Sequence, residues 1–294
     1  MENSNLYVDV HHHYKPDSAQ EIGQTLEMME EHGIRKSILS YPDESLLQSD
    51  KERVALCLKM NECFAKLTGK HSELGAFALI PMTLNHDFAL LEIERALDIL
   101  HLDGVLLPTC VSGIYPSSNL YHHIYEELNL RNGTIFFHPF NVNNRKMKSE
   151  DIIYRMMPEV TRATCELVLN KIIYKYPNIR FIMPYGGGNT SFLFQTDKRQ
   201  ILHSILSDSY SKEDAPHGIK YYLKSIYYDM AFPAQMNFMT SLSTFAERTK
   251  ILYGSDFPSF SADAIRQNLT NLEQHEYEDG KTMTDYCKAN SLHF

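Results

Sequence analysis

The sequence contains no tryptophan, and only five of its 294 residues are cysteine. The cysteine count is odd and no Cys-x-x-Cys pair occurs, so the pattern gives no sign of a disulfide framework. We expect reduced, mostly buried thiols in a cytoplasmic protein. The N-terminal residues also lack a basic segment followed by a long apolar run, and this pattern predicts no signal peptide.

Long apolar runs are missing too, and none approaches the ~20 residues that cross a bilayer. Positive charge is in the minority: the net charge is -9, which argues against a nucleic-acid surface. An anionic small substrate remains compatible with this charge, because a bound metal ion can dominate the local field. With 43% hydrophobic and 22% charged residues, the composition is that of a soluble globular protein with a sizeable core.

The most informative stretch that is present spans residues 7–16, with the sequence YVDVHHHYKP. It begins as a short alternating strand, in which successive side chains point to opposite faces. His11 and His13 therefore share one face, and His12 points the other way. Two imidazoles on one face can bind a single divalent metal ion. The alternatives are solvated loop histidines or the remnant of a purification tag, although a short run behind a credible strand argues against a tag.

Apolar strand-like runs alternate with amphipathic helical segments along the whole chain. We count eight such strands, at residues 7–13, 34–40, 75–80, 104–107, 134–139, 180–184, 225–230 and 250–256. The clearest helical segments between and after them are 17–33, 46–67, 87–100, 120–130, 160–174, 234–246, 262–272 and 282–290. This alternation predicts an α/β fold, a (β/α)8 TIM barrel forming a single domain over residues 1–294. A doubly wound open sheet is the main alternative, but no Gly-x-Gly-x-x-Gly follows the first strand.

One connection is unusually long and polar. Residues 140–157 follow the fifth strand and carry asparagines at 141, 143 and 144. Loops of this length are usually functional or disordered. We predict that this segment is a lid over the site.

In such a barrel the active-site residues lie at the C-terminal ends of the strands. His11 and His13 end the first run, His138 the fifth and Asp256 the eighth, while Tyr185 follows the sixth. Three imidazoles and a carboxylate would suit zinc or another divalent ion, with a position left for water. Taken alone, His138 is more simply a structural histidine and Asp256 a turn or N-cap residue.

Several short motifs, in order, resemble those of the amidohydrolase superfamily, of the amidohydrolase 2 type. They are DVHHH at 9–13, FHP at 137–139, TRA at 161–163, YPNIRFI at 176–182 and GSDFP at 254–258. The resemblance covers nearly the whole chain. Within the superfamily it is strongest to the metal-dependent enzymes related to 2-amino-3-carboxymuconate semialdehyde decarboxylase and γ-resorcylate decarboxylase.

The resemblance implies that His11, His13 and His138 bind the metal ion. It also implies that Asp256 is a fourth ligand or stands beside the water that the metal activates. No lysine ends a strand in the position of the bridging lysine of binuclear relatives, so we expect one metal ion per chain. We expect zinc, with manganese, iron, nickel and cobalt as alternatives.

Tyr185 departs from the family pattern, which has a histidine after the sixth strand. An ordinary tyrosine titrates near ~10 and a histidine near ~6.5, so we expect Tyr185 to donate a hydrogen bond rather than act as a base. Tyr185, Gly186 and Arg162 are the candidates for substrate binding, because arginine suits a bidentate contact with a carboxylate. The glycines at 186–188 are alternatively a flexible turn.

The leading hypothesis is a metal-dependent decarboxylase, a carbon–carbon lyase acting on a small aromatic or dienoic carboxylic acid. Asp256 and Tyr185 would be its catalytic residues, with Asp256 carrying the proton. The alternative is a metal-dependent hydrolase of a lactone, amide or ester, which needs the same residues. A third hypothesis, motivated by Tyr185, is a barrel that binds a metal or metabolite without catalysis. By analogy we expect a homodimer, without nucleic-acid or membrane partners.

Overall fold

A computed structural model describes residues 7–15, 22–42, 49–83, 86–111, 113–140, 152–194, 216–231 and 236–291. Eight strands form one parallel sheet in the order β1 to β8, so each strand neighbours the next one in sequence. Their bounds are β1 Tyr7–His13, β2 Ile34–Ser40, β3 Leu74–Leu79, β4 Gly104–Pro108, β5 Thr134–His138, β6 Arg180–Met183, β7 Tyr227–Asp229 and β8 Ile251–Leu252. The predicted strands are confirmed, with ends shifted by a few residues.

Backbone contacts between β1 and the segment that follows β8 close the sheet. The Val10 amide donates to the Tyr253 carbonyl over 3.1 Å, and the His13 amide donates to the Phe257 carbonyl over 2.7 Å. Asp9 and Tyr253 form a parallel bridge. The sheet is therefore a nearly closed (β/α)8 barrel, as predicted, and the open doubly wound alternative is wrong.

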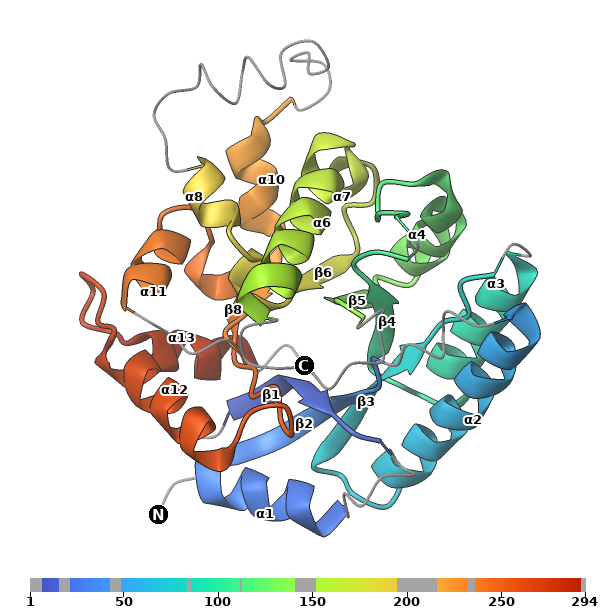
Figure 1. Cartoon of the computed structure of the whole chain (residues 1–294), viewed down its shortest axis with the longest axis horizontal. Coiled ribbons are helices and arrows are strands. Elements are labelled where there is room, and N and C mark those ends of the chain that lie inside the picture. Colours follow the sequence, from blue (N-terminus) through green and yellow to red (C-terminus); the bar gives the residue numbers. More distant parts are fainter. Residues whose placement is uncertain are drawn as a thin grey trace.

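Helices surround the barrel on its outside (Figure 1). They are α1 Ile22–His32, α2 Asp50–Thr68, α3 Asp87–Glu94, α4 His122–Leu130, α6 Met157–Leu169, α7 Ile172–Lys175, α8 Thr190–Phe194, α10 Ile219–Ser225, α11 Met236–Ser243, α12 Ala262–Gln274 and α13 Met283–Asn290. Local sequence fixes several of the helix ends. Helix α2 starts later than predicted, because Ser49 and Glu52 form a reciprocal capping box. The single helix predicted over 160–174 is divided into α6 and α7, because Lys171 adopts a left-handed conformation.

Short irregular turns complete the outer layer. Two π-helical turns, Arg95–Ile99 and Ile152–Met156, respectively extend α3 and precede α6. Three 3₁₀ turns, Asn119–Tyr121, Tyr185–Gly187 and Arg248–Lys250, lie before α4, after β6 and before β8.

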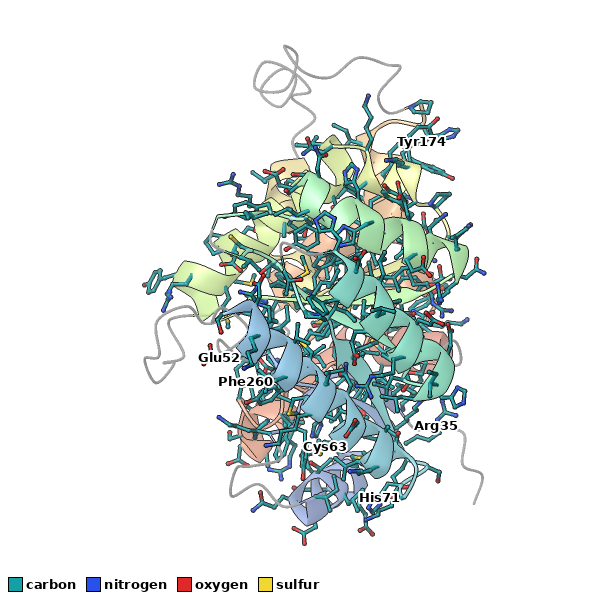
Figure 2. All side chains as sticks on the ribbon, turned by 90° about the vertical axis from the view of Figure 1, so that its right-hand side faces the viewer. Arg35, Glu52, Cys63, His71, Tyr174 and Phe260 are labelled. Carbon is teal, nitrogen blue, oxygen red and sulfur yellow. The ribbon has the colours of Figure 1, made fainter. Side chains whose placement is uncertain are left out.

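The interior of the barrel is packed with side chains and is not a pore. The strands are buried on both faces, as expected where helices cover a parallel sheet. Inside, the Phe77 and Phe136 rings lie with centroids 5.4 Å apart. Figure 2 shows the two ends of the barrel from the side of α2: Glu52 and Phe260 lie toward the end where β2 and β8 finish, and Arg35 and His71 lie toward the other. Because side chains fill the interior, a catalytic site has to lie at the ends of the strands.

Most of the predicted lid falls outside the described residues. Of the segment 140–157, the structure describes Phe140, the π-helical turn Ile152–Met156 and Met157, with which α6 begins. The lid therefore stays a prediction. In the described residues, no helix combines the length and the apolar character that crossing a membrane requires. None of the five cysteines, all of which lie in the described residues, forms a disulfide bond, as predicted.

Candidate metal centre and active site

The alternation of β1 places two histidines side by side at the barrel mouth. The Nε2 atoms of His11 and His13 are 3.2 Å apart. His12 points away, and its Nε2 lies 3.2 Å from the Thr25 hydroxyl on α1. The structure thus confirms the arrangement of these three side chains, with His12 in a structural position outside the cluster.

His138, the last residue of β5, completes a cluster of three imidazoles. Its Nε2 lies 3.0 Å from the Nε2 of His11, and the three ligand atoms all lie within 4.8 Å of one another. Imidazole nitrogens that share one zinc ion at 2.0–2.1 Å stand about 3.4 Å apart in tetrahedral geometry. The observed spacings of 3.0 and 3.2 Å are close to that value, so the three residues fit a metal ion.

Contacts at the Nδ1 atoms of two of the rings direct their Nε2 atoms toward the centre of the cluster. The His11 Nδ1 is 2.9 Å from the Asp229 Oδ2, which can only accept a hydrogen bond when ionised. The His13 Nδ1 is 2.9 Å from the Ser40 hydroxyl, and that hydroxyl donates to the His12 carbonyl. We therefore assign the proton to Nδ1 in both rings, as in a carboxylate–histidine–metal arrangement.

Asp229 also fixes the backbone around the cluster. Its Oδ1 accepts hydrogen bonds from the amides of Tyr185 and Ala231, each over 3.0 Å. The carboxylate is fully buried at the end of β7. One side chain thus connects β1, β7 and the turn after β6.

Asp256 stands beside the three histidines at the end of the barrel. Its Oδ1 lies 3.2 Å from the His13 Nε2 and 3.7 Å from the His11 Nε2. This buried oxygen forms no hydrogen bond within the described residues. The other oxygen, Oδ2, accepts a hydrogen bond of 2.9 Å from the Tyr185 hydroxyl. An unsatisfied carboxylate oxygen facing imidazole nitrogens again fits a bound cation.

Burial and neighbouring charge determine the protonation of the cluster in the absence of metal. Burial lowers the pKa of His138 well below its usual value, and the charges of His13 and His11 lower it further. Burial also lowers the pKa of His13, against the opposing effect of Asp256. Both rings are therefore neutral, the form that binds metal.

The pKa values of His11 and the two catalytic candidates follow from the same balance. Burial disfavours the charged form of His11, but Asp229 and Asp256 outweigh it and raise the pKa. Burial raises the pKa of Asp256, and the charges of His11 and His13 outweigh it, so the net pKa is lowered. Burial and the Asp256 charge raise the pKa of Tyr185 well above its usual value. Tyr185 is therefore a hydrogen-bond donor, as predicted.

The turn after β6 has an unusual backbone that aims Tyr185 at Asp256. Tyr185 has φ 52°, and the three glycines that follow also have positive φ. A Cβ on Gly186 would lie 2.5 Å from the Phe238 ring, and a Cβ on Gly187 would lie 2.7 Å from the Tyr228 ring. The glycines are thus required for the turn and its packing. The substrate contact predicted for Gly186 stays a prediction.

The structure does not bring Arg162 into the cluster. Its side chain on α6 is 60% exposed, pairs with Glu166 over 3.5 Å and lies over the Tyr115 ring, 3.8 Å from the centroid. These contacts belong to the outer layer of helices, and its predicted role in substrate binding gains no support from them.

Sequence reasoning missed Asp229, Ser40 and Asp9. Asp9 accepts hydrogen bonds from the amides of His11 and Ser255 and so connects β1 to the loop after β8. Ser40 is the last residue of a predicted strand, and Asp229 is the last residue but one of another. The strand-end rule that selected Asp256 therefore applied to them, but neither belongs to a recognised motif.

Comparison with known proteins gives a consistent picture. Residues 8–279 match the family described as Amidohydrolase. The decarboxylase yanB of Aspergillus niger is 27% identical over 90% of this chain and 81% of its own length. The 6-methylsalicylic acid decarboxylase of Penicillium expansum is 25% identical over 97% of this chain and 95% of its own.

A solved structure also has the same fold. The dihydroxybenzoic acid decarboxylase from Polaromonas sp. JS666, with bound manganese and the inhibitor 2-nitroresorcinol, superposes with a TM-score of 0.78. It is 17% identical, and the match covers 98% of this chain and 96% of that one. At this identity the similarity establishes the barrel fold.

Proposed function

Because the chain belongs to the amidohydrolase family, we propose that it is a metal-dependent decarboxylase that acts on a small aromatic carboxylic acid. The observation that carries this proposal is the convergence of three imidazole Nε2 atoms beside Asp256 at the barrel mouth. Relatives that align over nearly the whole chain are named decarboxylases, including one for 6-methylsalicylic acid. This agrees with the class of reaction and substrate expected from the sequence.

We propose that His11, His13 and His138 hold one divalent ion. The donor set suits several first-row metals, and imidazole alone does not choose between them. Manganese is bound in the dihydroxybenzoic acid decarboxylase and is a candidate here beside zinc. When bound, the ion supplies Lewis-acid chemistry to a substrate oxygen. Asp229 and Ser40 hold the His11 and His13 rings with their Nε2 atoms directed inward.

Asp256 is the proposed proton carrier. Decarboxylation replaces a carboxylate by hydrogen: a proton is added to the ring carbon, the bond to the carboxyl carbon breaks, and its electron pair returns to the ring as carbon dioxide leaves. Each turnover consumes one proton, which Asp256 takes from solvent and delivers. Its Oδ1 faces the cluster and forms no hydrogen bond in the part of the chain that the structure describes. Tyr185 holds Oδ2 and thereby fixes the direction of Oδ1.

The proposal is tested with purified protein supplied with manganese or zinc and a panel of hydroxybenzoates. We expect release of one carbon dioxide per acid consumed, and a metal content near one ion per chain that falls in His138→Ala. The matched control is His275→Ala, a buried histidine that follows α12. Hydrolysis of lactones or amides without carbon dioxide release would overturn the lyase assignment. Metal content that survives His138→Ala would overturn the ligand set.

Three further expectations stay predictions. They are a single domain with a lid at 140–157, a homodimer and a cytoplasmic location. Light scattering on the purified protein tests the second.

A further inference from the structure

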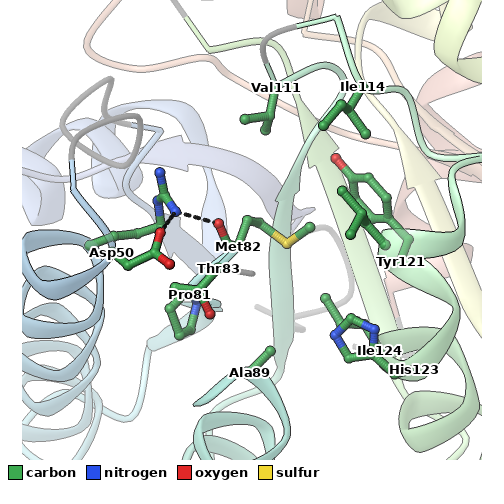
Figure 3. Close-up of a pocket in the computed structure, with 12 residues that line it drawn as sticks. Asp50, Pro81, Met82, Thr83, Ala89, Val111, Ile114, Tyr121, His123 and Ile124 are labelled. Atoms are coloured by element: carbon green, nitrogen blue, oxygen red, sulfur yellow. Dashed lines mark hydrogen bonds and ion pairs between the residues drawn. The ribbon is translucent and has the colours of Figure 1, made fainter. Parts of the chain in front are cut away.

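A cavity of about 230 Å³ lies where the loops after β3 and β4 meet the helices that follow them. Figure 3 shows Met82 and Thr83 after β3, Val111 and Ile114 after β4, and Ile124 on α4 around it. A ~150 Å³ apolar cavity holds benzene, so this one has room for a substituent of several carbons. Its place at the C-terminal strand ends is the side of the barrel where substrates bind.

The walls of this cavity are mainly apolar. Of the polar side chains beside it, Arg53 and Tyr121 have protein partners, whereas the buried Nδ1 of His123 forms no hydrogen bond within the described residues. The Arg53 Nη1 donates to the Asp50 carboxylate over 2.7 Å and to the Met82 carbonyl over 2.5 Å. The Tyr121 hydroxyl donates to the Pro108 carbonyl over 3.4 Å. Aliphatic side chains of Met82, Val111 and Ile124 form much of the remaining wall. Such a surface favours a hydrocarbon group.

A second, much smaller cavity of about 10 Å³ lies beside the first. It shares Arg53, Met82 and Val111 with the larger cavity, and Pro108 and Phe140 line its other side. Both of these residues are neighbours of His138. Pro108 pairs with His138 across β4 and β5, and Phe140 follows His138 by two residues in the chain.

Met82 lines both cavities, so its side chain separates them and has to move aside before a ligand can pass from one to the other. Methionine is unbranched and rearranges readily, so a ligand can displace it at low cost. An aromatic acid bound at the histidines would then direct a substituent outward between the ends of β3 and β4.

We propose that the larger cavity is a specificity subsite that receives an alkyl substituent of the substrate ring. This inference rests on the proposed function for the position of the acid group, and it names the substrate class more closely. The substrate is an alkyl-substituted hydroxybenzoic acid, whose acid end lies at the histidines and whose hydrocarbon end lies among Met82, Val111 and Ile124.

The test fills the cavity from the side of α3. Ala89 is buried and lines the cavity, so Ala89→Leu places three more carbons in the space proposed for the substituent. The matched control is Ala96→Leu, a buried alanine in the π-helical turn after α3 that does not line the cavity. Binding of two hydroxybenzoates to the metal-loaded protein, one plain and one with a propyl group, is measured by calorimetry.

Each methylene buried should tighten binding about fourfold. We therefore expect the parent and Ala96→Leu to prefer the propyl acid by at least tenfold, and Ala89→Leu to lose this preference while binding the plain acid as before. His138→Ala should weaken both acids by the same factor, because it acts on their common end.

Equal affinity of the parent for the two acids would overturn the subsite, as would a preference that survives Ala89→Leu. Calorimetry does not require turnover. If no acid releases carbon dioxide but the propyl preference is present and is lost in Ala89→Leu, the proposed reaction fails and the subsite stands.

Discussion

The Tyr185 hydroxyl donates a 2.9 Å hydrogen bond to Asp256, and both residues have a left-handed backbone, with φ of 52° and 53°. Such conformations are costly for residues other than glycine and persist where the surrounding structure imposes them. Here the Asp229 carboxylate holds the Tyr185 amide, and the His11 carbonyl accepts from the Asp256 amide over 2.8 Å. Both members of the pair are therefore fixed from the same strand ends that carry the metal centre.

Removing the Tyr185 hydroxyl should slow catalysis without releasing the metal. A hydrogen bond to a charged group contributes about 1.5–3 kcal/mol, so Tyr185→Phe should lower kcat about 10- to 100-fold if Asp256 needs its fixed direction. Metal content measured alongside should stay the same, because Tyr185 contacts none of the three histidine Nε2 atoms by a hydrogen bond in the described residues.

The matched control is Tyr253→Phe. The Tyr253 hydroxyl is buried and forms no hydrogen bond within the described residues, so its loss should leave kcat unchanged. An unchanged kcat in Tyr185→Phe would refute the positioning role. Activity that appears only in Tyr185→His would favour the hypothesis that the parent binds metal without catalysis.

Replacing Asp229 should weaken metal binding through His11. In Asp229→Asn the amide can still accept from the backbone at one atom, but it cannot accept at both the backbone and His11. Loss of such an outer partner typically costs 10–100-fold in metal affinity, and we expect a loss of about that size in a chelator competition assay.

Asp103→Asn is the control for this variant. Asp103 pairs with Lys36 over 2.6 Å and accepts from the Ala76 amide, and it precedes β4 at the opposite end of the barrel. The two variants lose the same charge, so a similar affinity in both would mean that Asp229 does not act on the metal centre.

The barrel could be predicted from the sequence because its evidence is local. Eight apolar runs with helical segments between them are visible one by one, and their order determines which strand ends meet. The same reasoning placed His11, His13, His138 and Asp256 together, and the structure brings them within hydrogen-bonding or ion-pairing distance.

The other features of the site depend on contacts between segments that are distant in sequence, and no local sequence pattern reveals such contacts. Asp229 differs from other strand-end carboxylates only because β7 brings it to the rear of the His11 ring. The prediction that Arg162 binds substrate gained no support, also because of the fold. Its residue type suits a carboxylate, but the rotation of α6 directs its side chain outward to Tyr115 and Glu166.

His123 should make the protein less stable in mild acid. Burial, followed by the charges of the stacked His86 and of His122, lowers its pKa to about 4 against the opposing effect of Glu126. The unfolded chain has the ordinary value near ~6.5 and therefore binds more protons between these values, so stability falls as the pH drops from ~6.5 to ~4.

The measurement is the melting temperature at several pH values in that range, for the parent and for His123→Gln. The parent should lose more stability on acidification than the variant, because glutamine does not titrate. Identical pH dependence in the two proteins would show that His123 is readily protonated in the folded state.

A methyl group on Gly254 should disturb the metal centre from behind. A Cβ at this position would lie 2.8 Å from the His11 Cβ, closer than real Cβ atoms approach, and 3.1 Å from the Ala231 Cβ, a tight contact. Overpacking of this kind typically costs 1–3 kcal/mol, and in Gly254→Ala the displaced group would be His11, a proposed metal ligand. Gly23→Ala is the control, because none of the described residues lies within 4 Å of its added Cβ. The residue is in helix α1, where alanine is favoured over glycine by about 0.5–1 kcal/mol. Urea unfolding should therefore show a less stable protein for Gly254→Ala and a slightly more stable one for Gly23→Ala, with weaker metal binding in the former alone.

If Gly254→Ala keeps the parent's metal affinity, the His11 ring is not held as tightly between β8 and the cluster as these distances require.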